Sequence, residues 1–219
     1  MKYDKKSALK IIIEAARNYD SYLNRKNFLI VYQEGQEVKY TEVGFRDMNF
    51  LHLTGVNTKI SAQKFYEYCI ANRLSENDFE IDKEGKVQRK LMVLPYLHEL
   101  LYHNCIIGEF INSGIMIKAD YFVGDTKLVL SVGFRREHEN DIPVTLYSGD
   151  VRKLTNPTNK VLAIFVRSFP DGIYKKATYI SKDVELDDLD LPQFDSHHPL
   201  SEILRVYQGI FFNAWELTE

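Results

Sequence analysis

The stretch from Asn104 to Phe134, NCIIGEFINSGIMIKADYFVGDTKLVLSVGF, decides the fold class because the hydrophobic period changes there. From this point apolar runs of strand length replace helical spacing, and turn signals such as Asn156-Pro157-Thr158-Asn159 separate them. Several connections are too short for helical crossovers, so the sheet should be largely antiparallel. The expected strands are Cys105–Ile111, Ile115–Val123, Lys127–Phe134, Val144–Tyr147 and Val161–Arg167.

The chain before this stretch combines helical patterns with one hairpin. Asn27–Gln33 and Glu37–Phe45 alternate like strands around a short turn. Helices are expected at Ser7–Leu23, at Ser61–Asn72 and at Lys86–Tyr102, the last broken or kinked at Pro95. Helices mainly first and strands afterwards predict an α+β fold, with N-terminal helices packed on a mainly antiparallel sheet of about five strands.

The end of the chain differs in composition from the rest. Ser181–Ser196 is acidic and indicates a surface linker or arm, and Pro199–Trp215 has the pattern of an apolar helix. We therefore expect residues 1–180 to form one domain and residues 181–219 to add a linker and a C-terminal helix. That helix could dock on the domain, on a protein partner, or on a second copy of the chain.

Composition limits the function classes. The net charge of −3 over 219 residues excludes a globally basic nucleic-acid binder, so a polyanion would have to meet a local basic patch. No apolar run is long enough to span a bilayer, and no signal peptide is recognisable. Cys69 and Cys105 lie in apolar surroundings and fit no metal spacing, which predicts buried free thiols and a cytoplasmic protein.

The segment Phe45–Val56, FRDMNFLHLTGV, holds the first candidate for chemistry. If the segment is extended, His52 and Thr54 lie on one face of the sheet. An imidazole can move a proton near neutral pH, and a hydroxyl can hydrogen-bond a phosphate oxygen. The competing interpretation is a histidine whose ring packs and whose nitrogens bond to the backbone.

Cationic side chains near the ends of the expected strands form the second set of candidates. Arginine and lysine there could clamp phosphate groups, although solvated surface positions explain the same residues. No phosphate-binding loop, dinucleotide fingerprint or HExxH motif is present, and no cofactor or metal is expected. The expected substrate contacts are Arg46, Arg136, His138, Lys153 and Ser168, with Arg135 and Arg167 closest to the chemistry.

Several runs together resemble a known family. FLHLTGV, KFYEYCIANRLSENDF, ADYFVGDTKLVLSVGF and IPVTLY are similar to the barnase–EndoU–colicin–RelE-like (BECR) nucleases of phages and mobile elements. The resemblance covers roughly residues 22–168, and its most specific part is Phe50–Gly55. Members of that superfamily are typically metal-independent ribonucleases, with N-terminal helices followed by an antiparallel sheet.

The resemblance implies roles for particular residues. His52 matches the motif histidine, with Thr54 beside it, whereas Arg135 and Arg167 are looser matches by strand position. The implied mechanism uses His52 as general base or acid on the ribose 2′-hydroxyl, and Thr54 with an arginine stabilises the pentacoordinate phosphate. The product would be a 2′,3′-cyclic phosphate.

Two other functions are carried forward. The acidic balance and the apolar C-terminal helix favour a non-enzymatic interaction module of a phage or mobile element. A His-x-Thr on an early strand also occurs in folds that transfer ADP-ribose from NAD. That activity would require Tyr66, Tyr68 and a later glutamate such as Glu109 to line one pocket.

Overall fold

A curled antiparallel sheet forms the centre of the computed structural model, which describes residues 2–111, 117–125, 127, 129–170, 174 and 176–184. Its eight strands are β1 (Lys26–Glu34), β2 (Glu37–Phe45), β3 (Ile106–Phe110), β4 (Tyr121–Asp125), β5 (Leu130–Arg135), β6 (Ile142–Ser148), β7 (Thr155–Ser168) and β8 (Lys176–Ile180). Their order is β2-β1-β7-β3-β4-β5-β6, and β8 pairs with β7.

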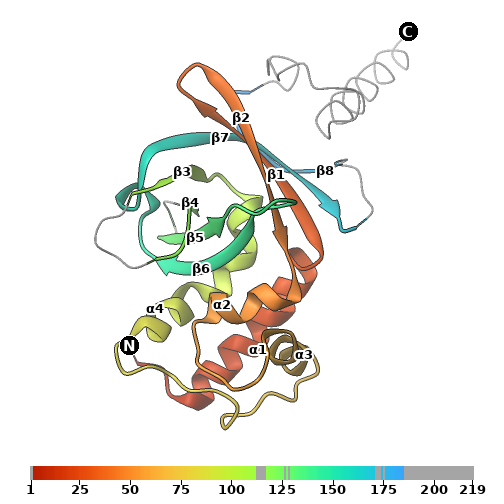
Figure 1. Cartoon of the computed structure of the whole chain (residues 1–219), viewed down its shortest axis with the longest axis vertical. Coiled ribbons are helices and arrows are strands. Elements are labelled where there is room, and N and C mark those ends of the chain that lie inside the picture. Colours follow the sequence, from red (N-terminus) through yellow and green to blue (C-terminus); the bar gives the residue numbers. More distant parts are fainter. Residues whose placement is uncertain are drawn as a thin grey trace.

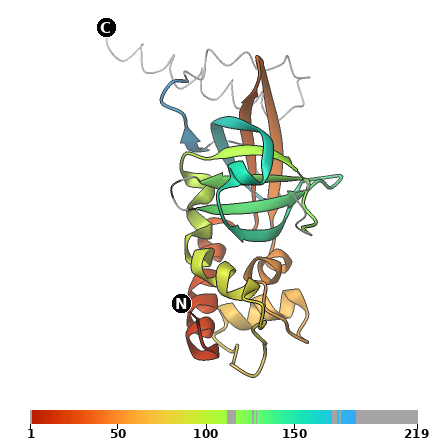
Figure 2. The ribbon, with the colours of Figure 1, turned by 90° about the vertical axis from the view of Figure 1, so that its left-hand side faces the viewer.

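Helices gather at one end of this sheet (Figures 1 and 2). The α-helices in the described part are α1 (Lys5–Tyr22), α2 (Phe50–Thr54), α3 (Ala62–Ile70) and α4 (Lys86–Val93). The same described ranges contain three 3-10 helices: η1 (Asp47–Asn49), η2 (Leu94–Tyr102) and η3 (Val151–Lys153).

The two edges of the sheet meet at one point. Val43 in β2 bridges to Asp141, the residue before β6. The Gly44 N–H donates to the Asp141 carbonyl at 2.8 Å, and the Asp141 N–H donates to the Glu42 carbonyl at 2.9 Å. Because its two edges meet, the sheet curls round on itself and has an inner and an outer face.

Side chains on the inner face continue into the helical layer as one hydrophobic core. Phe28 and Ile30 of β1 and Val132 of β5 are fully buried there. The helix α1 covers this core with residues at helical spacing, including Ile12 and Tyr19. Because successive side chains of a strand point to opposite faces, the same strands can carry polar groups on the other face of the sheet.

The structure confirms the α+β class but corrects the number of strands, which is eight rather than about five. The hairpin β1–β2 joins the same sheet through β7, and β8 had no expected counterpart. The strand expected at Ile115–Val123 begins only at Tyr121 in the described residues.

The turn expected at Asn156–Asn159 is also wrong, because these residues lie inside the long strand β7. Pro157 is accommodated where the register between β3 and β7 shifts, opposite Gly108 and Phe110. A Cβ at Gly108 would stand only 2.3 Å from the Pro157 carbonyl oxygen, so glycine is required for this close approach.

Other expectations on the fold have clear outcomes. The break at Pro95 is confirmed, since α4 gives way to η2 at Leu94. Cys69 and Cys105 are buried free thiols, as predicted. The helix expected at Pro199–Trp215 lies outside the described residues.

Candidate active-site groove

The motif Phe50–Gly55 is helical rather than extended. Within α2, Phe50, Leu53 and Thr54 are buried at helical spacing, and His52 is turned outward and exposed. Residues two apart on a helix do not face the same way, so the expected shared face of His52 and Thr54 is wrong. The Thr54 hydroxyl is used internally, donating to the Leu51 carbonyl at 2.7 Å.

Most residues of this motif have a structural role that accounts for their presence, but the imidazole of His52 does not. Gly55 ends α2 in the left-handed region with φ 74°, and its N–H donates to the Leu51 carbonyl at 3.2 Å. Phe50, Leu53 and Thr54 fill the core or close the helix. Among the described residues, no hydrogen bond to the His52 side chain is found, although the His52 carbonyl accepts one from Lys90 Nζ at 2.8 Å.

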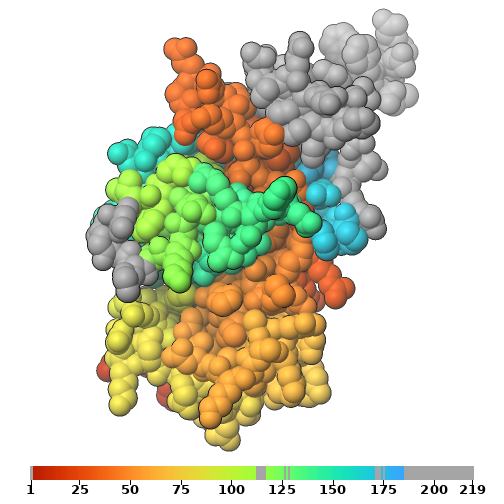
Figure 3. Space-filling model, in the orientation of Figure 1, coloured from red at the N-terminus to blue at the C-terminus, as the bar shows by residue number. Residues whose placement is uncertain are grey.

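His52 lines a hollow of about 530 Å³ between η1–α2 and β6, which we call the His52 groove. Figure 3 shows the segment carrying β6 directly above the segment carrying α2 on this face of the molecule. The lining residues are Met48, Asn49, His52, Ala62, Ile117, Lys118, Arg135, Ile142, Pro143, Val144 and Thr145.

Two cations share the groove with the imidazole. Lys118 and Arg135 are exposed, and Arg135 Nε donates to Glu137 at 2.7 Å. An exposed ion pair of this kind contributes little stability, so a phosphate can replace the carboxylate. The Asn49 amide oxygen accepts from the Arg46 N–H at 2.8 Å, which fixes its orientation, and Thr145 adds a hydroxyl from β6.

A second hollow of about 480 Å³, the Phe169 hollow, adjoins the groove. Ile142 lines both. Two residues expected to contact substrate, Arg46 and His138, lie here rather than beside His52. Its other lining residues are Gly44, Glu137, Glu139, Asn140 and Phe169.

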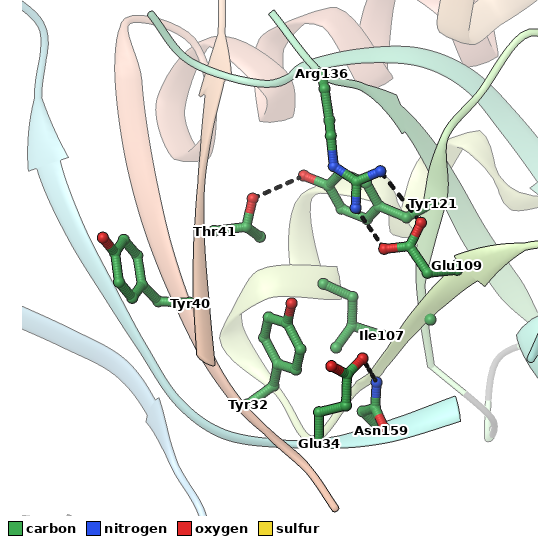
Figure 4. Close-up of a pocket in the computed structure, with 10 residues that line it drawn as sticks. Tyr32, Glu34, Tyr40, Thr41, Ile107, Glu109, Tyr121, Arg136 and Asn159 are labelled. Atoms are coloured by element: carbon green, nitrogen blue, oxygen red, sulfur yellow. Dashed lines mark hydrogen bonds and ion pairs between the residues drawn. The ribbon is translucent and has the colours of Figure 1, made fainter. Parts of the chain in front are cut away.

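A third hollow, the mouth hollow, lies at the open end of the curled sheet and measures about 100 Å³ (Figure 4). The two terminal nitrogens of the Arg136 guanidinium, Nη1 and Nη2, both donate to the Glu109 carboxylate, Nη1 at 3.1 Å. The Asn159 amide donates to Glu34 at 3.4 Å, and Lys39 also pairs with Glu34. The charges in the mouth hollow therefore neutralise one another.

Hydrogen bonds also occupy the polar groups behind the mouth hollow. Asp141 accepts from the Tyr121 hydroxyl at 2.8 Å and from the Thr41 hydroxyl at 2.7 Å. Burial, followed by the nearby Asp141 charge, raises the pKa of Tyr121 well above its usual value, so this phenol stays protonated. The network is satisfied without a ligand, which favours a structural role for it.

The remaining candidates do not join His52. Arg167 pairs with Glu42 at 2.7 Å, and its guanidinium lies 5.3 Å from the Tyr174 ring centroid. Lys153 and Ser168 are exposed and line none of the three hollows. The structure therefore brings together His52 and Arg135, and it adds Lys118, Asn49 and Thr145, which the sequence did not single out.

Lys90, which holds the end of α2, gives a pH-dependent prediction. Burial lowers the pKa of its ammonium to about 8. Between pH 8 and the ordinary lysine pKa the folded state loses a proton that the unfolded state keeps, so this group adds stability as pH rises. Relative to Lys90→Met, the wild type should gain up to a few kcal/mol in the free energy of unfolding over that window.

Urea denaturation of both proteins at several pH values between about 7 and 9.5 measures this difference. Comparing the two proteins cancels the other titrating groups. Parallel stability profiles would show that the Lys90 ammonium is not desolvated in the folded protein.

The comparison with protein families decides the classification. Residues 11–183 match the model described as phage-Barnase-EndoU-ColicinE5/D-RelE like nuclease4. The chain belongs to this BECR nuclease family. Neither a curated protein nor a solved structure matches it significantly.

Membership gives the BECR resemblance a wider extent than the motifs alone indicated. The family match includes α1 from residue 11 onward and all of β8, both of which extend beyond residues 22–168. The nuclease character of the BECR family implies a nucleic acid as the substrate class. Within the described ranges no helix is long and apolar enough to cross a membrane.

Proposed function

We propose that this protein is a metal-independent endoribonuclease whose active site is the His52 groove. The observation that carries the proposal is the exposed, structurally unused imidazole of His52 in one hollow with Lys118 and Arg135. A proton-transfer group and two cations are what phosphate-ester cleavage requires when no metal takes part.

The chemistry needs one base and a positive environment. His52 takes the proton of the ribose 2′-hydroxyl, and the 2′-oxygen attacks phosphorus. The bond from phosphorus to the 5′-oxygen breaks, the 5′-oxygen takes up a proton from water, and a 2′,3′-cyclic phosphate remains. Lys118 and Arg135 hold the non-bridging oxygens and stabilise the charge that develops on the pentacoordinate phosphate.

The two other functions find less support in the geometry. The His-x-Thr that suggested ADP-ribose transfer lies on a helix, and Glu109 lies in the mouth hollow. Tyr66 instead donates to Asp20 at 2.7 Å beside a different surface depression. The non-enzymatic module was suggested by the acidic balance and by the C-terminal helix, and that helix lies outside the described residues.

Incubation of the purified protein with end-labelled single-stranded RNA in excess EDTA tests the proposal. We expect RNA fragments that end in a 2′,3′-cyclic phosphate, while DNA of the same sequence stays intact because it lacks the 2′-hydroxyl. Intact RNA in EDTA, cleavage that appears only with added divalent metal, or cleavage of the DNA would each contradict it.

A further inference from the structure

Phe169 presents an aromatic ring at the end of β7, where a core residue is not needed. The side chain is 41% exposed. The Arg46 guanidinium covers one face of the ring, with its central carbon 3.7 Å from the ring centroid. A cation at this distance is attracted by the ring quadrupole and holds the ring in place.

The arginine behind the ring is itself fixed. Its Nη1 donates to the Phe45 carbonyl at 2.8 Å and its Nη2 donates to the Asn27 side-chain oxygen at 2.7 Å. Asn27 is fully buried, and the Phe169 N–H donates to the Arg25 carbonyl at 2.9 Å. Ring and guanidinium therefore form a preorganised flat platform on the surface.

The platform lies along the groove in which we place the chemistry. Ile142 lines both the His52 groove and the Phe169 hollow, so the two hollows adjoin at this residue. On one side, η1 follows directly after Arg46 and supplies Met48 and Asn49 to the groove. An RNA chain bound at His52 would thus place a neighbouring nucleotide at Phe169.

We propose that the Phe169–Arg46 platform stacks a nucleobase of single-stranded RNA next to the cleaved bond; this inference rests on the proposed function. Every base has a π-face, so stacking binds without a strong preference among bases. His138, which lines the same hollow, can offer a ring nitrogen to the edge of the stacked base. An unpaired nucleotide is required, because a base within a duplex cannot stack on a side chain.

The test compares substitutions at one ring. Phe169→Leu removes the aromatic face but keeps an apolar side chain, whereas Phe169→Trp keeps a face. The probe is a fluorescently labelled 2′-O-methyl RNA hexamer, which cannot form a cyclic phosphate and therefore reports binding alone. We expect Phe169→Leu to weaken binding of the hexamer about 5- to 150-fold and Phe169→Trp to retain it.

Cleavage separates this inference from the proposed function. With cleavable RNA, Phe169→Leu should raise KM for a hexamer and leave kcat nearly unchanged, because the platform binds a base and contacts none of the reacting atoms. Equal hexamer binding by the wild type and Phe169→Leu, with unchanged melting curves, overturns the stacking site even if the wild type cleaves RNA. If Phe169→Leu binds the hexamer more weakly than the wild type does, but the wild type cleaves no RNA, the platform is supported and the nuclease assignment is contradicted.

Discussion

His52→Ala is expected to lower kcat/KM for RNA cleavage by about 10²–10⁴-fold, the range typical of general acid–base catalysis. The loss should be chemical rather than structural. The imidazole is exposed and makes no hydrogen bond to the described residues, so its removal leaves α2 and its buried side chains intact. Cleavage rates and thermal melting of the two proteins, measured side by side, check both parts.

Glu109→Gln is the matched comparison for that experiment. It neutralises the carboxylate of the mouth hollow and keeps its shape, and we expect it to retain cleavage because Glu109 lies outside the His52 groove. A large loss in Glu109→Gln together with normal cleavage by His52→Ala would move the catalytic site to the mouth hollow. Melting curves again separate a loss of chemistry from a loss of fold.

Phe45→Ala is expected to destabilise the fold strongly, costing about 3–5 kcal/mol in the free energy of unfolding. The side chain is 1% exposed. Its ring lies 6.0 Å from Tyr19 of α1, 5.8 Å from Phe28 of β1 and 6.0 Å from Phe134 of β5, measured between centroids. Truncation therefore opens a cavity where the helical layer meets both sides of the curled sheet.

Urea denaturation measures this cost in free energy, and the melting temperature should decrease by about 6–20 °C for a chain of this length. Met92→Ala serves as the control, since Met92 is 48% exposed on α4 and surface changes usually stay within about 0.5 kcal/mol. A cost below about 1 kcal/mol for Phe45→Ala would show that packing of the Phe45 ring does not hold the helical layer and the sheet together.

The sequence predicted the class of the fold because local patterns carry that information. The change of hydrophobic period near Asn104 and the apolar spacing of α1 both correspond to observed elements. Strand number was harder to predict, because it depends on pairing. Pro157 looks like a turn residue, yet a bulge opposite Gly108 keeps it within β7.

The site was predictable only in part. The resemblance indicated His52, and strand position indicated Arg135, but Lys118 and Thr145 reach the same groove only through the curl of the sheet. The five residues of α2 cover little more than one turn, too few for a helical period to be recognised. The threonine of IPVTLY, a polar residue in an apolar strand, was the one local signal for Thr145.

The two buried thiols have a practical consequence. Burial raises the pKa of Cys69 to about 12 and raises that of Cys105 further, so neither sulfur forms a thiolate near neutral pH. An alkylating reagent can therefore modify them only in molecules that have opened. The rate of alkylation therefore reports how often the protein opens, and the measurement needs neither an engineered label nor a substrate.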